Sequence, residues 1–69
     1  MKTRKVEESE LKVGLLYKVV IDDCCVAGEF TSKFLGEVDG EFVFENGIKL
    51  YMTYGCNYEE VETEENPFF

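Results

Sequence analysis

The side chains that could perform acid–base or nucleophilic chemistry are few in this chain. It has fifteen acidic residues and three cysteines but no histidine, so the commonest general base and the usual partner of a Ser or Cys nucleophile is missing. Two carboxylate pairs, Asp22/Asp23 and Glu59/Glu60, are adjacent in sequence. Adjacent residues on a strand point to opposite faces, so neither pair would converge on one substrate atom. The sequence therefore predicts no catalytic residues and no enzymatic activity.

The cysteines are Cys24, Cys25 and Cys56. A structural zinc site needs four ligands and a close C-x₂₋₄-C pair, and neither condition is met. An odd number of cysteines, two of them adjacent in sequence, is also a poor disulfide framework. We therefore expect reduced thiols and no bound metal. The six glycines are scattered at turns and form no phosphate-binding loop. We expect no cofactor.

Size and charge limit the class of protein further. A chain of 69 residues can bury one small core, which predicts a single domain. Its net charge of −8 opposes the nucleic-acid backbone, so direct nucleic-acid binding is disfavoured. No apolar run approaches the roughly 18 residues of a membrane span, and the start, MKTRKVEESE, lacks the apolar stretch of a signal peptide. We therefore expect a soluble, cytoplasmic protein without a membrane partner.

The clearest structural pattern is a β-hairpin over residues 41–54. Phe42 and Phe44 occupy alternate positions, and after Asn46-Gly47 the apolar residues again alternate with polar ones, which indicates one buried face. A two-residue type I′ turn would split the two apolar sets between opposite faces. A three-residue loop, 45–47, instead pairs Phe44 with Ile48 and Phe42 with Leu50. Gly47 is then expected to adopt the left-handed conformation.

Alternation predicts further strands over 13–21, over 25–38 with a bend at Gly28, and over 58–62. A loop that includes Val38 would keep Phe34 opposite Phe44. Residues 1–10 have no periodic pattern and are expected to form an N-terminal arm, while 63–69 form an acidic, aromatic tail. The residues expected in the core share the inward parity of these strands: Val13, Leu15, Tyr17, Val19, Ile21, Phe30, Phe34, Phe42, Phe44, Ile48, Leu50, Met52 and Val61.

Five short strands with tight Gly, Asp and Asn turns favour an all-β barrel with flexible termini. The order Leu11-Lys12-Val13-Gly14-x-x-Tyr17-x-Val19, then Gly28-x-Phe30, then Gly40-x-Phe42-x-Phe44-x-Asn46-Gly47 resembles the small SH3-like (Tudor-like) barrels. The resemblance covers residues 11–62 and implies a module that binds peptides, proteins or nucleic acids. An OB-like barrel fits less well. That fold usually carries a helix between its third and fourth strands, and here Gly47 follows Phe44 too closely to leave room for a helix.

Tyrosines form the first candidate binding surface. Tyr51 has the outward parity of its strand, and Tyr54 and Tyr58 lie near the Gly55 turn, with Tyr17 as a further candidate. Tyrosine offers flat apolar area and a hydroxyl, and SH3-like domains often bind ligands with aromatic side chains at such loops. The alternative is that these rings cap the ends of a small barrel.

The tail is the second candidate. Glu64, Glu65, Pro67 and Phe68 or Phe69 resemble the acidic tip of bacterial single-stranded-DNA-binding proteins, which docks onto partners through its last aromatic residue and its carboxylate. Such a tail would place its aromatic rings in an apolar pocket while its glutamates meet a basic rim. The alternative is that Phe68 and Phe69 fold back and complete the core.

These observations predict a small acidic protein-interaction module or adaptor, such as a phage or bacterial accessory protein, whose partner is another protein with a basic or apolar groove. The alternative is an inhibitor that mimics nucleic acid and occupies the basic groove of a DNA- or RNA-binding enzyme. The two differ in salt dependence, because a mimic should release its partner steeply as ionic strength rises.

Overall fold

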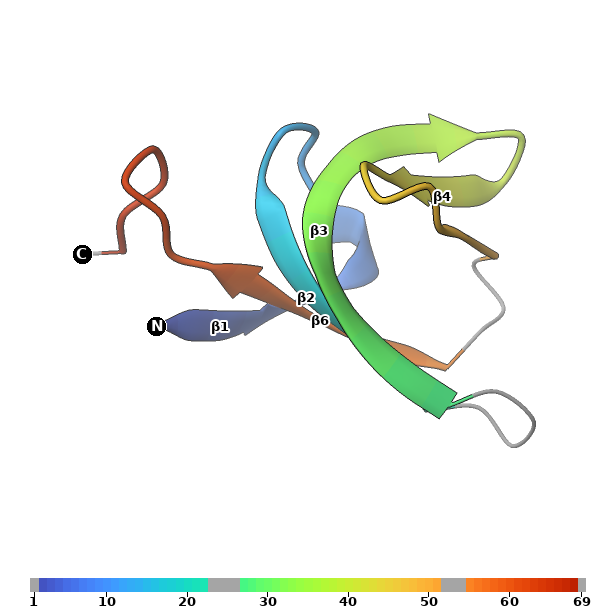
Figure 1. Ribbon diagram of the computed structural model, residues 1–69, viewed down its shortest axis with the longest axis horizontal. Coiled ribbons are helices and arrows are strands. Elements are labelled where there is room, and N and C mark those ends of the chain that lie inside the picture. Colours follow the sequence, from blue (N-terminus) through green and yellow to red (C-terminus); the bar gives the residue numbers. More distant parts are fainter. Residues whose placement is uncertain (1, 23–26, 52–54, 69) are drawn as a thin grey trace.

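The computed structural model describes residues 2–22, 27–51 and 55–68. They form one antiparallel sheet with the strand order β1-β6-β2-β3-β4-β5 (Figure 1). Strands β2 to β5 follow one another as a meander, and β6 returns to lie between β1 and β2. The elements are β1 (Thr3–Val6), the short 3-10 turn η1 (Glu8–Glu10), β2 (Leu16–Asp22), β3 (Ala27–Val38), β4 (Glu41–Phe44), β5 (Lys49–Tyr51) and β6 (Cys56–Val61). The predicted all-β class is confirmed, and within the described ranges the sheet is open, with β1 and β5 at its edges.

The N-terminal segment differs from the sequence prediction, which treated residues 1–10 as an arm. Thr3–Val6 form β1, which pairs with β6, so the described residues contain six strands where five were expected. Only Val6 is buried in β1, so the strand has no apolar alternation that could reveal it. Lys and Arg on an edge strand also discourage pairing with other chains.

The predicted hairpin register is confirmed where it is described. Phe42 lies opposite Leu50, and the Phe44 N–H donates to the Ile48 carbonyl at 3.0 Å. The three-residue loop closes through the Gly47 N–H, which donates to the Phe44 carbonyl at 3.0 Å, and Gly47 has φ +89°. Apolar parity therefore determines register here. Met52 and Tyr54 lie outside the described residues.

Strand β3 reaches the predicted pairing of Phe34 with Phe44 by another route. Val38 pairs with Glu41 and is not in the loop, so the turn contains only Asp39 and Gly40, both with positive φ, as a type I′ turn requires. A β-bulge between Phe34 and Gly36 restores the register. The irregularity is at Gly36 rather than at the predicted Gly28, and β3 curves from its pairing with β2 to its pairing with β4 (Figure 1).

The core is formed mainly by aromatic side chains from β2, β3, β4 and β6. Phe34 is at its centre, with its ring centroid 6.4 Å from Tyr17, 5.7 Å from Phe42 and 5.5 Å from Phe44. Such offset and edge-to-face contacts add to the energy of burial. The buried apolar residues among those described are Val6, Tyr17, Val19, Phe34, Phe42, Phe44, Leu50, Tyr58 and Val61.

Most of the predicted core is therefore confirmed, and Leu15, Ile21 and Phe30 are partly buried against it. The prediction that Val13 belongs to the core is wrong, because this residue is 68% exposed. Strand β2 begins only at Leu16, after a turn in which Gly14 has φ +91°, so strand parity does not extend to Val13. Ile48 is exposed, in the loop just before β5. Val6 and Tyr58 are buried residues that the prediction omitted.

Candidate binding groove

A groove of about 560 Å³ lies between the η1 segment and strands β3 and β4. Its volume is within the roughly 300–1,000 Å³ typical of ligand sites. Apolar side chains of Leu11, Val13, Phe34 and Phe42 line it together with three glutamates. Phe34 and Phe42 belong to the core cluster, so the groove has a firm aromatic base. The complete lining is Glu7, Glu8, Ser9, Leu11, Val13, Phe34, Gly36, Glu37 and Phe42.

Backbone hydrogen bonds hold the wall that carries Val13. The Gly14 N–H donates to the Phe34 carbonyl at 2.8 Å, and the Phe34 N–H donates to the Leu15 carbonyl at 3.0 Å. The Lys12 N–H donates to the Tyr17 hydroxyl at 2.9 Å. A Cβ at Gly36 would lie 3.8 Å from Val13 Cγ2, so Val13 stands directly beside the bulge of β3. The wall is therefore fixed, although the Val13 side chain is open to solvent.

The rim of the groove is acidic. Glu7 and Glu8 lie on the side of η1, and Glu37 lies on β3. None of the described residues that line the groove is Lys or Arg. The ion pairs found in the described ranges, Arg4–Glu60 and Lys18–Glu29, are elsewhere. A cleft lined by one sign of charge concentrates the field and attracts ligands of the opposite sign.

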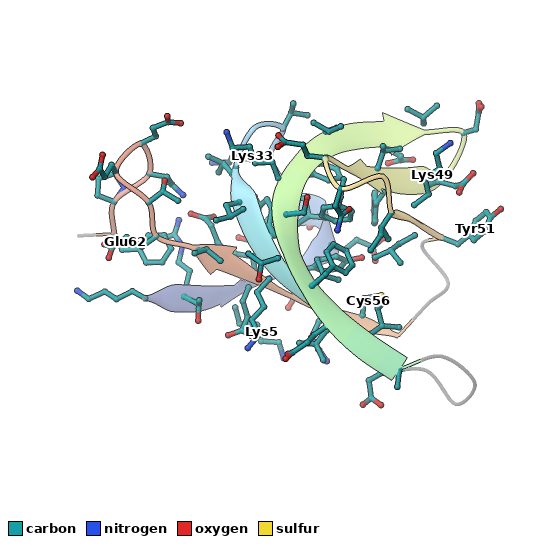
Figure 2. The ribbon with its side chains drawn as sticks, in the orientation of Figure 1. Lys5, Lys33, Lys49, Tyr51, Cys56 and Glu62 are labelled. Atoms are coloured by element: carbon teal, nitrogen blue, oxygen red, sulfur yellow. The ribbon has the colours of Figure 1, made fainter. Side chains whose placement is uncertain are left out.

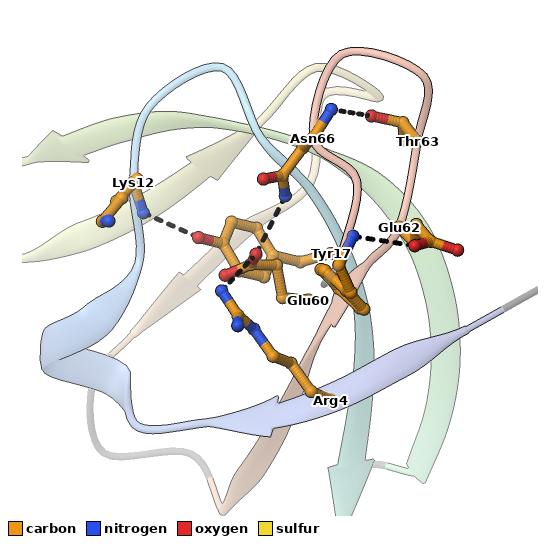
Figure 3. A network of polar contacts seen from close by, with 8 residues as sticks. Arg4, Lys12, Tyr17, Glu60, Glu62, Thr63 and Asn66 are labelled. Atoms are coloured by element: carbon orange, nitrogen blue, oxygen red, sulfur yellow. Dashed lines mark hydrogen bonds and ion pairs between the residues drawn. The ribbon is translucent and has the colours of Figure 1, made fainter.

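The C-terminal tail is folded onto the sheet through polar contacts (Figure 3). Glu60 is buried, and its Oε2 accepts a hydrogen bond from Arg4 Nη2 at 2.9 Å and from Asn66 Nδ2 at 2.8 Å. Thr63 and Asn66 exchange backbone hydrogen bonds of 3.2 and 3.1 Å, which closes a small turn. We call Arg4, Glu60, Glu62, Asn66 and Phe68 the C-terminal cluster.

Phe68 is also held within this cluster. Its backbone N–H donates to Glu62 Oε2 at 2.7 Å, and its ring lies under the Arg4 guanidinium, 4.7 Å from Cζ to the ring centroid. This is the geometry of a cation–π contact. The ring therefore lies against β1 and is not part of the core cluster. Of the other predicted tail residues, Glu64, Glu65 and Pro67 are exposed, and Phe69 lies outside the described residues.

The predicted tyrosine site is not assembled by the described residues. Tyr51 is 51% exposed and points away from the sheet (Figure 2), as its parity predicted. Tyr58 is only 3% exposed, and its ring is 6.3 Å from Phe42 in an edge-to-face contact. Burial, followed by the neighbouring Cys56 and Glu8, raises the Tyr58 pKa above its ordinary value. Tyr17 is fully buried, and its pKa is also raised by burial; Tyr54 lies outside the described ranges.

Sequence reasoning missed the groove, because its lining comes from three separate segments. The one usable signal was Gly14, which ends the alternation after Val13 and so leaves that side chain outside the strand. Glu7 and Glu8 fall within the predicted arm, and Glu37 is not among the residues predicted to face inward. Nothing in their spacing shows that the bulge at Gly36 brings β3 next to the 11–14 segment.

Comparisons with known proteins give no match to any family model, curated protein or solved structure. No helix among the described residues has the length and apolarity to cross a membrane. The groove combines a concave shape, the exposed apolar side chain of Val13 and carboxylates as the only charged groups among its described lining residues.

Proposed function

We propose that this chain is a small non-catalytic protein-interaction module that holds a segment of a partner protein in the groove. The observation that carries the proposal is the pairing of an apolar wall, the exposed Val13 and the partly buried Leu11, with a rim of carboxylates that has no Lys or Arg among its described lining residues. Exposed apolar surface with a polar rim is typical of interaction sites. Among the described residues, burial raises the pKa of Tyr17 and of Tyr58, and both belong to the core cluster.

The proposal includes an SH3-like architecture for β2 to β6. Three features support it: the meander of β2 to β5, the return of β6 to the side of β2, and the strongly curved β3 that contributes to both halves of the sheet. Strand β1 is then an additional edge strand. Folds of this kind are used for many functions, so the fold supports an interaction module without selecting its partner.

The groove is favoured over the tail as the binding site. A tail that inserts Phe68 into a partner must first give up the Arg4 contact and the hydrogen bond to Glu62. Those losses reduce the net binding free energy. The groove needs no such rearrangement, because Val13 is already exposed beside it.

Mimicry of nucleic acid is the alternative function, supported by the net charge of −8. Its difficulty is the outward face of the sheet, which mixes both signs. Glu59 lies opposite both Lys5 and Lys18 in the neighbouring strands, and Lys18 Nζ is 3.7 Å from Glu29 Oε2. This mixture of signs makes the outward face of the described sheet a poor match for a uniformly basic site.

Affinity capture with matched variants tests the proposal. Val13→Asn removes the exposed apolar wall, and Leu35→Asn makes the same kind of change at another exposed position, 49% exposed on β3. We expect one partner, identified by mass spectrometry, to bind the wild type, Leu35→Asn and Phe68→Ala, and to be lost by Val13→Asn. Partner loss with Phe68→Ala alone would make the tail the ligand. Equal retention by all variants, with release by salt, would favour mimicry.

A further inference from the structure

The chemistry of the groove also indicates what it binds. Resting on the function proposed above, we propose that its occupant is a short cationic segment of the partner in which an apolar side chain is flanked by Lys or Arg. The apolar side chain would contact Leu11 and Val13, and the flanking cations would meet Glu7 or Glu8 on one side and Glu37 on the other.

The apolar part follows from the lining. Val13 is 68% exposed, Leu11 is partly buried against the core, and the buried Phe34 and Phe42 also line the groove. An apolar side chain placed here removes its own surface and that of Val13 from water, which is favourable in proportion to the area buried. A volume of about 560 Å³ accommodates a few side chains and is too small for a folded domain. This size fits a short segment of a partner protein.

The cationic part follows from where the carboxylates lie. Glu7 and Glu8 come from the η1 side and Glu37 comes from β3, so acidic groups reach the groove from two separate elements. Among the described residues, neither Glu8 nor Glu37 forms an ion pair. An acidic segment or a nucleic acid would be repelled by this rim, whereas Lys or Arg would be attracted.

The chain itself is a poor source of such a segment. Its most basic stretch, 2–5, is held in place by the pairing of β1 with β6, and Arg4 is engaged by Glu60 and Phe68. A second copy would also bring another net charge of −8 toward an acidic rim. The occupant is therefore a different protein.

Three synthetic peptides of equal length test this inference, each acetylated and amidated: Gly-Lys-Leu-Lys-Gly, Gly-Ser-Leu-Ser-Gly and Gly-Lys-Ser-Lys-Gly. Each is titrated into the ¹⁵N-labelled full chain and followed by amide chemical shifts. We expect the Lys-Leu-Lys peptide to shift the amides of Leu11, Val13, Gly36 and Glu37, and the other two to bind at least about tenfold more weakly. If the Ser-Leu-Ser peptide binds as tightly as the Lys-Leu-Lys peptide, the occupant does not need cations. If the Lys-Ser-Lys peptide binds as tightly as the Lys-Leu-Lys peptide, the occupant does not need an apolar side chain.

Charge-neutral variants locate the interaction. Glu37→Gln keeps the size of the side chain and removes one rim charge, and Glu45→Gln makes the same change at an exposed position outside the groove. We expect Glu37→Gln to weaken the Lys-Leu-Lys peptide severalfold, with an effect that shrinks at high salt, and Glu45→Gln to leave it unchanged. An equal effect of both variants would overturn the inference, because it would report net charge alone.

The two proposals can fail separately. If none of the peptides binds while the captured partner still depends on Val13, the cationic occupant is wrong and the interaction module stands. If Val13→Asn captures the partner as well as the wild type does, the groove is not the interaction site, regardless of whether the peptides bind. Retained amide dispersion in each variant's spectrum shows that the fold is intact.

Discussion

Two regions of this small sheet are held together in opposite ways. The aromatic cluster of Phe34, Phe42, Phe44 and Tyr58 is stabilised by burial and ring packing. The C-terminal cluster is held by directional contacts on Glu60, the first of which joins Arg4 to a residue 56 positions away. Burial is non-directional and its large contributions accumulate, whereas a single hydrogen bond contributes about 0.5–1.5 kcal/mol net. The first region should therefore determine whether the chain folds, and the second should determine where its ends lie.

At the groove, the residues that stabilise the fold differ from those expected to contact a ligand. Phe34 and Phe42 belong to the aromatic cluster and also line the groove, so part of the groove is held by core packing. Val13 and Glu37 add an exposed outer layer that contributes little to folding, because exposed side chains away from special features change stability by about 0.5 kcal/mol or less. Variants of this outer layer can test binding without unfolding the protein.

The largest expected effect is at the centre of the aromatic cluster. Phe44 is 1% exposed, and replacing it with Ala should reduce the free energy of unfolding by about 3–5 kcal/mol through lost burial and a cavity. Chemical denaturation followed by circular dichroism measures the change. Val38→Ala, at a position 58% exposed on β3, is the control and should change stability by less than about 0.5 kcal/mol. A loss below about 1 kcal/mol for Phe44→Ala would contradict the central place given to this cluster.

Alkaline pH tests the same cluster through its tyrosine. Burial raises the pKa of Tyr58, and that of Tyr17, in the folded state. The unfolded chain loses these protons near pH 10 while the folded chain keeps them, so stability is complete below about pH 10 and falls above it. Each such tyrosine steepens the fall by up to about 1.4 kcal/mol per pH unit.

Denaturation midpoints between pH 8 and pH 11.5 measure this fall. Tyr58→Phe should fall less steeply above about pH 10 than the wild type does, because one of the two buried phenols is gone. Identical slopes for the two chains would show that Tyr58 ionises as readily in the folded state as in the unfolded state, which would contradict its burial in the core.

The same difference explains what the sequence could predict. Register in the hairpin follows from apolar parity, and the pairings of Phe42 with Leu50 and of Phe34 with Phe44 are confirmed. Strand β1 could not be found this way, because only one of its four residues is buried and its sequence therefore shows no apolar alternation. The C-terminal cluster could not be found either, because Arg4 and Glu60 are far apart in sequence and come together only in the folded chain. Directional contacts between distant residues leave no local pattern.

The candidate sites follow the same rule. Tyr51 was placed on the outward face correctly, because that required only parity. Tyr58 was placed near a loop, but β6 begins at Cys56 and its alternation directs Tyr58 inward. The groove depends on a bulge, a turn and a 3-10 segment that meet in space. No single stretch of sequence contains that information.

In the C-terminal cluster, the larger expected effect comes from its cation. Arg4→Met leaves the buried Glu60 carboxylate with Asn66 as its described partner, and we expect a loss of about 1–2 kcal/mol in unfolding free energy, since a buried charge then loses a charged partner. Lys18→Met breaks the exposed pair with Glu29 and should cost at most about 0.5–1 kcal/mol. Equal losses for the two variants would mean that Glu60 gains nothing from its burial beside Arg4.

The smallest expected effect is the contact between Phe68 and Arg4, and it requires a double-mutant cycle. Phe68→Leu keeps an apolar side chain and the backbone hydrogen bond to Glu62 but removes the ring under the guanidinium. At a partly exposed site the cation–π contact should contribute about 0.5–1 kcal/mol. Phe68→Leu should therefore lower the free energy of unfolding by about 0.5–1 kcal/mol in the wild type and by almost nothing in the Arg4→Met background. Additive losses would show that the ring and the guanidinium are neighbours without an energetic coupling, and the tail would then be positioned by Asn66 and Glu62 alone.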